Sequence, residues 1–129
     1  MTKQVVTINS DQSALDAALI MKEKRISSLI VQDNDTPVGI ITERDFVKRV
    51  CANDRKSSEV KIAELMSKIQ TFADPNTPVD VAVQRMINNR IRRLPVINNG
   101  KVVGIITVTD LAKELRRIML TQGIIELID

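Results

Sequence analysis

Two matching pairs of polar residues could bind a phosphorylated sugar. A threonine precedes an aspartate by three residues at Thr42 and Asp45, and again at Thr107 and Asp110. Each pair follows an apolar strand and opens a predicted helix, where unpaired backbone N–H groups favour phosphate. The threonine hydroxyl could donate a hydrogen bond to that phosphate, and the aspartate could accept two from a ribose diol. Both residue types are also ordinary helix caps, so each pair alone predicts either a helix start or a nucleotide site.

The residue types that the chain lacks narrow the chemistry. It contains no histidine, tryptophan or tyrosine. Histidine general bases, histidine metal sites and most aromatic surfaces for base stacking are therefore excluded. No nucleophile with an adjacent base, no paired buried carboxylates and no metal-ligand cluster can be assigned. We therefore expect a binding protein without a metal site rather than an enzyme.

Charge and cysteine content indicate which ligands and which cellular compartment suit the protein. The net charge is +3 and the pI is near 9.2, which suits anionic small ligands but is weak evidence for nucleic acid. The single cysteine, Cys51, cannot form an internal disulfide. No apolar run reaches the roughly 18 residues of a membrane-spanning helix. We expect a cytoplasmic protein with no membrane partner.

An internal repeat organises the chain. A shift of 65 residues aligns the two halves without a gap, and the run Val38–Thr42 is identical to Val103–Thr107. Identities elsewhere fall in predicted helices, strands and turns: Ala17 and Ala82, Met21 and Met86, Arg25 and Arg90, Leu29 and Leu94, Val31 and Val96, Asn34 and Asn99. We divide the chain into a first copy (1–56), a connector with a short helix (57–66), a second copy (67–122) and a tail (123–129).

Both copies predict the element order β-α-β-β-α. In the first copy, Asp11 or Ser13 could cap the first helix. The elements expected there are a strand at 5–8, a helix at 14–24, strands at 26–31 and 38–42, and a helix from about residue 43. Three short strands bury little apolar surface alone. The copies should therefore pack together about a pseudo-twofold axis, in a mixed α/β (α+β) fold.

The second copy carries clear start and turn signals. Thr77 and Pro78 should cap and open its first helix, with Pro78 in the first turn. Asn99 and Gly100 predict a tight hairpin turn. The last helix should run from Leu111 to about residue 121. Glycines at the start of the paired strands, such as Gly39, predict a close approach of another backbone segment.

In this order, the residues of each copy resemble the CBS domain, named for cystathionine beta-synthase. The second copy matches throughout, with Arg92–Val96 reading Arg-Arg-Leu-Pro-Val and Gly104–Asp110 reading Gly-Ile-Ile-Thr-Val-Thr-Asp. The first copy keeps Gly39–Asp45, but Ser27 and Ser28 replace the arginine pair. The resemblance implies two related clefts that bind adenosine derivatives: AMP, ADP, ATP, S-adenosylmethionine, NAD or coenzyme A.

The resemblance also implies which residues form each cleft. The first would combine Thr42, Arg44, Asp45, Lys68, Arg92, Arg93 and Pro95. The second would combine Lys3, Ser27, Ser28, Thr107, Thr109 and Asp110. Because arginine binds phosphate through two parallel hydrogen bonds, the first cleft should be the tighter phosphate site. The second could bind adenosine or a less charged ligand, or stay empty.

Neighbouring basic residues allow a different interpretation. Arg92 and Arg93 are adjacent on a strand, so one of them could point away from the cleft. A basic cluster that includes Lys48 and Arg49 is interpreted as solvent-exposed surface. Whether these side chains point into the cleft or into solvent therefore decides between an anion site and ordinary surface charge.

The function that we expect is regulatory. The module would bind an adenosine-containing nucleotide and signal by changing its shape or its affinity for an effector protein. Apolar residues in the last helix and tail favour a homodimer: Leu111, Leu115, Ile118, Met119, Ile124, Ile125 and Leu127. The alternatives are a ligand-free dimerisation scaffold, a nucleic-acid-binding protein and, last, an enzyme.

Overall fold

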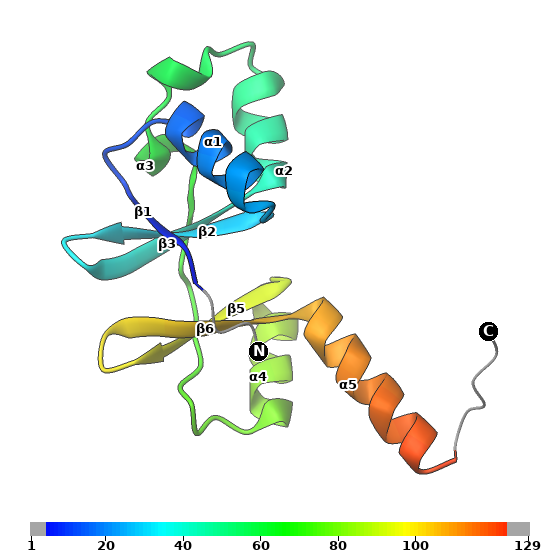
Figure 1. The fold of residues 1–129 in the computed structure, drawn as a ribbon. Helices are drawn as coiled ribbons and strands as arrows, with labels where there is room; N and C mark the ends of the chain where they lie inside the picture. The colour runs from blue at the N-terminus through cyan, green and yellow to red at the C-terminus, as the bar shows by residue number, and fades with distance from the viewer. Residues whose placement is uncertain (1–4, 124–129) are drawn as a thin grey trace.

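The computed structural model describes residues 5–123, and its first copy has the predicted order of elements (Figure 1). These are β1 (Thr7–Asn9), α1 (Ala14–Lys24), β2 (Ser28–Asp33), β3 (Thr36–Thr42), α2 (Glu43–Phe46) and a π-helical turn, η1 (Val47–Cys51). Of the two predicted caps of α1, Ser13 is the one used. Its hydroxyl accepts a hydrogen bond from the Asp16 N–H at 3.1 Å, and the Asp16 carboxylate accepts one from the Ser13 N–H at 3.1 Å.

In the connector and the second copy, the last helix begins three residues before the predicted Leu111 and the predicted first strand is reduced to a bridge between Ala73 and Val96, but the elements otherwise follow the prediction. These are a 3₁₀ turn η2 (Ser57–Glu59), α3 (Ile62–Leu65), β4 (Ser67–Lys68), α4 (Val79–Asn89), β5 (Arg93–Asn98), β6 (Lys101–Thr107) and α5 (Val108–Thr121). The predicted start of α4 is wrong by one residue, because Pro78 is its N-cap. Thr77 does not cap it, since the Thr77 hydroxyl accepts the Asp74 N–H at 2.9 Å. The predicted hairpin turn is confirmed, with φ of 53° at Asn99 and 78° at Gly100.

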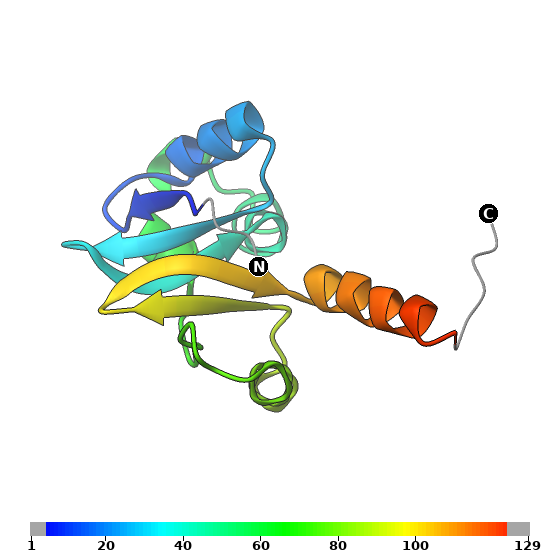
Figure 2. The same cartoon turned by 60° about the horizontal axis from the view of Figure 1, so that its bottom comes forward.

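The two sheets face each other at the centre, and helices cover their outer faces (Figures 1 and 2). The first sheet has the order β1-β2-β3-β4, and the second pairs β5 with β6. In the first copy Ile8 pairs in parallel with Val31, and 65 residues later Ala73 pairs in parallel with Val96. This shared register confirms that the fold consists of two β-α-β-β-α repeats.

The connector and the strand that follows it, β4, are held against the first copy. Strand β4 pairs with β3, where Gly39 lies opposite Lys68. A Cβ atom on Gly39 would lie 2.9 Å from the Ser67 carbonyl oxygen, which confirms the predicted close approach. The Arg49 guanidinium donates hydrogen bonds of 2.8 Å to the carbonyls of Leu65 and Met66. The segment that enters the second copy is thus held against the first.

Each copy has its own apolar core, and the two cores differ in extent. The first core includes Leu29 and Val31 from β2 and continues into the connector through Ile62 and Leu65. The second core is a smaller cluster that contains Leu94 of β5 and its neighbours: Ala73, Ala82, Met86 and Val96. The first copy is therefore covered on a side where the second is not.

Helix α5 extends away from the body of the molecule (Figures 1 and 2). None of its described residues is buried. The apolar residues Ile124, Ile125 and Leu127, which we included in a predicted dimer surface, lie outside the described residues. Across residues 5–123, no helix combines the length and apolar character needed to span a membrane.

Candidate functional site

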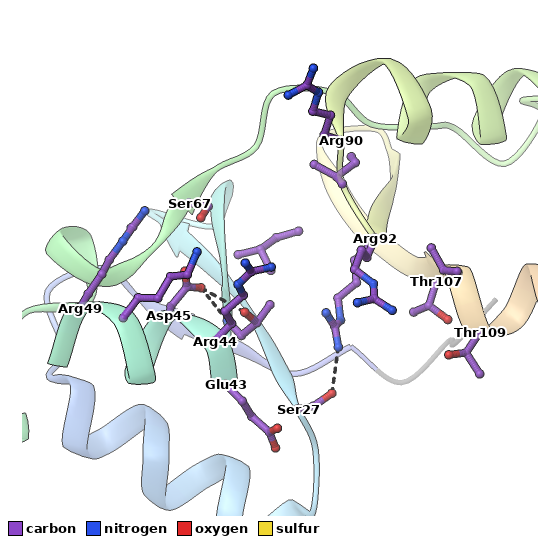
Figure 3. A pocket seen from close by; sticks show the side chains of 16 residues that line it. Ser27, Glu43, Arg44, Asp45, Arg49, Ser67, Arg90, Arg92, Thr107 and Thr109 are labelled. Carbon is purple, nitrogen blue, oxygen red and sulfur yellow. Dashed lines mark hydrogen bonds between the residues drawn. The ribbon is translucent and has the colours of Figure 1, made fainter. Parts of the chain in front are cut away.

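A cavity of about 660 Å³ opens where the two copies meet. Figure 3 shows Arg44 and Asp45 on the side of the first copy, Arg92, Thr107 and Thr109 on the side of the second, and Ser27 between them. The lining residues come from both repeats: Ser27, Ile40, Thr42, Glu43, Arg44, Asp45, Lys48, Arg49, Ser67, Arg90, Ile91, Arg92, Arg93, Thr107, Val108 and Thr109. The cavity is thus a product of the packing of the two copies.

Thr42 and Asp45 form the junction between β3 and α2. The Asp45 carboxylate accepts a hydrogen bond from the Thr42 N–H at 2.8 Å, and the Thr42 hydroxyl lies 3.4 Å from the same oxygen. Asp45 therefore acts as a helix cap, as the simpler interpretation of the motif predicts. Only one carboxylate oxygen is used in this way among the described residues. The other oxygen can still accept a hydrogen bond from a ligand.

The second copy repeats this junction with one difference. The Asp110 carboxylate accepts the Thr107 N–H at 3.1 Å, and the Thr107 hydroxyl accepts the Asp110 N–H at 3.1 Å. Thr107 lines the cavity but Asp110 does not. In this copy both partners of the motif are used for capping, and the carboxylate lies outside the lining.

Arg92 and Arg93 both line the cavity, although they are adjacent in sequence. Arg92 precedes the first residue of β5, so strict alternation between the faces of a strand does not separate the two side chains. The Arg93 guanidinium donates a hydrogen bond of 3.1 Å to the Ser27 hydroxyl of the first copy. This contact joins the arginine pair of one copy to the serine that replaces it in the other.

The charge of the cavity is strongly positive. Six cationic side chains line it: Arg44, Lys48, Arg49, Arg90, Arg92 and Arg93. Two acidic side chains, Glu43 and Asp45, line it as well. The excess of four positive charges is larger than the +3 of the whole chain. Positive charge is therefore concentrated here rather than spread evenly over the surface.

Some of these cations were missed by sequence reasoning. Lys48 and Arg49 were interpreted as solvent-exposed surface, and both are exposed; what the sequence did not indicate is that both also line the cavity and that Arg49 donates to two backbone carbonyls. The available signal was the spacing of four residues between Arg44 and Lys48, which places both on one side of a helix. Arg90 gave no signal, because it occupies the left-handed C-cap position of α4.

Some of the remaining predicted site residues lie outside this cavity, and others line it. Lys68 lines a separate hollow of about 520 Å³ with Met66 and Phe72. Pro95 is fully buried in β5, where its carbonyl accepts the Ala73 N–H at 2.9 Å. Ser28 begins β2 and is not part of the cavity lining, and Lys3 lies outside the described residues. Ser27, Thr107 and Thr109, assigned to the second predicted cleft, share one cavity with residues of the first.

The cavity lacks the ligands that a metal would need. Within residues 5–123, no group of three or more cysteine, histidine, aspartate or glutamate side chains is placed to hold a metal ion. Its lining combines cationic donors, three threonine hydroxyls near helix starts and two carboxylates. This set can bind an anionic ligand that also carries hydroxyl groups.

Comparison with known proteins gives a consistent result for both copies. The chain matches the CBS domain over residues 1–52 and 62–117. An uncharacterised protein of Methanopyrus kandleri is 37% identical over 84% of this chain and 57% of its own length. The CBS domain-containing protein YhcV of Bacillus subtilis is 33% identical over 87% of this chain and 79% of its own length. The chain thus spans little more than half of the first of these relatives.

Solved structures agree with this match. A putative signal-transduction protein with CBS domains from Burkholderia ambifaria superposes with a TM-score of 0.78, at 33% identity over 88% of this chain and 83% of its own. A hexameric CBS-CP12 protein from bloom-forming cyanobacteria superposes with a TM-score of 0.77, at 36% identity over 87% of this chain and 66% of its own. The predicted resemblance is thereby confirmed for both copies.

Proposed function

Because the chain belongs to the CBS domain family and carries two CBS domains in tandem, we propose that it is a regulatory module that binds an adenosine-containing nucleotide. The observation that carries the proposal is the cavity between the copies, with four more positive than negative side chains in its lining. A cavity of about 660 Å³ falls within the size range of small-molecule sites, roughly 300–1,000 Å³.

The residues suggest how such a ligand would bind. Arg92 and Arg93 would hold a phosphate from the side of the second copy, and Arg44 would reach it from the first. The free oxygen of Asp45 would accept a hydrogen bond from a ribose hydroxyl. The excess of positive charge in the cavity favours ligands with several negative charges, such as ADP, ATP, NAD or coenzyme A. AMP would bind with fewer contacts, and the cationic S-adenosylmethionine would be disfavoured.

Binding would act on the junction of the copies. Because both copies contribute to the lining, a bound anion would neutralise charges that repel one another in its absence. The occupied state should hold the two copies more firmly, and an effector protein could recognise it. The resemblance to a protein described as a putative signal-transduction protein supports this role. The exposed cysteine, Cys51, suits a reducing cytoplasm.

An assembly role is the second candidate, and the exposed apolar side of α5 favours it. Leu115 and Ile118 are exposed on this helix, and one structural relative is described as hexameric. A homodimer built on α5 would cover this surface. A ligand-free scaffold would need this surface but not the cationic cavity.

Binding measurements separate the two candidates. We expect ADP and ATP to raise the melting temperature more than AMP does. Guanine nucleotides should raise it less than the adenine nucleotides do. Saturation at 100 times Kd should add about 2.7 kcal/mol to the stability. The control is Arg116→Ala, which removes an exposed arginine outside the cavity. If no adenine compound at millimolar concentration shifts the melt, the scaffold is the better description.

A further inference from the structure

Arg49 both lines the cavity and binds the connector. Figure 3 shows its side chain extending from the helix toward the segment that carries Ser67. Its terminal nitrogen Nη1 donates hydrogen bonds of 2.8 Å to the carbonyls of Leu65 and Met66. Leu65 is the last residue of α3 and Met66 is its C-cap, so these carbonyls have no partner inside the helix. The Arg49 guanidinium thus supplies hydrogen bonds that the end of α3 lacks.

Arg49 has hydrogen-bond donors left for a ligand. A guanidinium carries five N–H groups, and both bonds to the connector come from the nitrogen Nη1. Among residues 5–123, no acceptor is bonded to the Nε or Nη2 atom of Arg49. The edge formed by these two nitrogens is suited to a phosphate group, which it can bind through two parallel hydrogen bonds. Arg49 can therefore hold an anion and the connector at the same time.

The chain continues directly from this contact into the wall of the cavity. Ser67 follows Met66 and is part of the cavity lining. It belongs to β4, where it pairs with Ile40 of β3, another residue of the lining. A change in how firmly Arg49 holds the end of α3 therefore acts where the chain passes from the connector to the second copy.

The described part of the second copy has no such contact. A shift of 65 residues matches Arg49 with Glu114, which forms an ion pair with Arg117 of the same helix. The backbone differs as well. In η1 the Ala52 N–H donates to the Val47 carbonyl, five residues earlier, at 2.9 Å, whereas α5 is a continuous α-helix. Because π-helical turns occur frequently at functional sites, this local departure from the repeat points to a role for the first copy alone.

We propose that Arg49 couples the cavity to the connector. An anion bound in the cavity takes the free edge of the guanidinium, and the guanidinium then holds the end of α3 more firmly. This coupling rests on the proposed function and identifies the connector as the part that responds to the ligand. The exposed residues Lys61, Ala63 and Glu64 would present the occupied state to a partner protein. By linkage, a firmly held connector also raises the affinity for the anion.

Hydrogen exchange of the ligand-free protein tests the contact itself. The reporter amides are those of Met66 and Ile69, which donate to carbonyls of α3 and β3 at 2.9 and 3.2 Å. The amide of Ile97 in β5 is the reference for global stability. Arg49→Met should speed exchange of the reporters about tenfold relative to the reference. The matched control is Lys48→Met, which removes a neighbouring cation of the same lining and should leave them within about twofold. Unchanged exchange in Arg49→Met would overturn the proposal.

Exchange with bound ADP tests the coupling. Calorimetry first gives the Kd of each variant, and exchange is then measured at the same multiple of that Kd. In the parent and in Lys48→Met, ADP should slow the reporter amides about fivefold more than the Ile97 amide. In Arg49→Met this extra slowing should be lost. If ADP does not bind to the parent, the proposed function is rejected together with the coupling. Binding without the extra slowing, or with the same extra slowing in Arg49→Met, would reject the coupling alone.

Discussion

The first and second copies share a sequence pattern but differ in what surrounds it. Their hairpins have the same register, with a bulge after Val31 in one and after Val96 in the other. The first copy is closed by the connector and has serines at the junction, whereas the second has an open helix and an arginine pair. Duplication has therefore preserved the frame, while the flanking segments and the junction residues have diverged.

The largest expected effect is on the two cores. Leu29→Ala and Leu94→Ala remove equivalent, fully buried side chains from β2 and β5. Each should cost about 2–5 kcal/mol of unfolding free energy, with the larger loss at Leu29 because its core continues into the connector. Urea denaturation of both variants measures this difference. A larger loss at Leu94 would show that the second core is not the weaker one.

The next largest effect is expected on ligand binding, when an arginine of the second copy is replaced by the serine that the first copy has at the junction. Arg92→Ser gives the second copy the residue that the first has at the equivalent position, Ser27. Loss of a charge-assisted hydrogen bond of about 1.5–3 kcal/mol should weaken the binding of ADP roughly tenfold to a hundredfold. Adenosine carries no phosphate and should bind within about twofold of the parent. Calorimetry with Arg116→Ser as the control tests this, and an equal loss for both ligands would contradict the assignment of Arg92 to phosphate.

A smaller effect separates the first helices of the two copies. Helix α1 has a reciprocal cap made by Ser13 and Asp16, while Pro78 gives α4 no side-chain cap. Ser13→Ala should therefore cost about 1 kcal/mol in thermal unfolding. Ser58→Ala, an exposed serine in the connector, should stay within about 0.5 kcal/mol. Equal losses of stability in the two variants would show that the Ser13 cap does not stabilise α1.

The smallest effect concerns Glu64 of the connector. A hydrogen bond from the Lys61 backbone N–H, with further help from the Arg55 guanidinium, lowers the pKa of Glu64 below its usual value. A lowered folded-state pKa stabilises the fold above the unfolded pKa, and this gain is lost as the pH falls through the folded value. Glu64→Gln should lower the Tm slightly at pH 7 and not at pH 3. A larger loss at pH 3 than at pH 7 would contradict this sign.

Much of the fold could be predicted because it is local and duplicated. The shift of 65 residues gave the strands and hairpins of both copies, and α1 was predicted with its observed bounds, Ala14–Lys24. The direction of α5 could not be predicted, because the apolar face of a helix does not specify which surface it packs against. The start of α4 was missed by one residue because the Thr77 hydroxyl binds a loop amide instead of capping the helix.

The site was predictable in its motifs but not in its boundaries. Sequence indicated Thr42, Asp45 and the arginine pair as neighbours, and all of them line one cavity. It divided the lining into two clefts, because repeat symmetry assigns one motif to each. In space the copies meet closely enough for Ser27 to bond Arg93, so residues of both assignments share the cavity. Lys68 is held against β3 by strand pairing, which a charge count along the sequence does not reveal.

The central claim is that Asp45, and not Asp110, belongs to the ligand site. Both carboxylates cap their helices, so Asp45→Ala and Asp110→Ala each remove a cap and serve as matched controls for stability. Of these two aspartates, only Asp45 lines the cavity. Calorimetric titration with AMP should show about tenfold weaker binding for Asp45→Ala, and a change of less than about twofold for Asp110→Ala. Loss of AMP binding in Asp110→Ala with intact binding in Asp45→Ala would contradict the account.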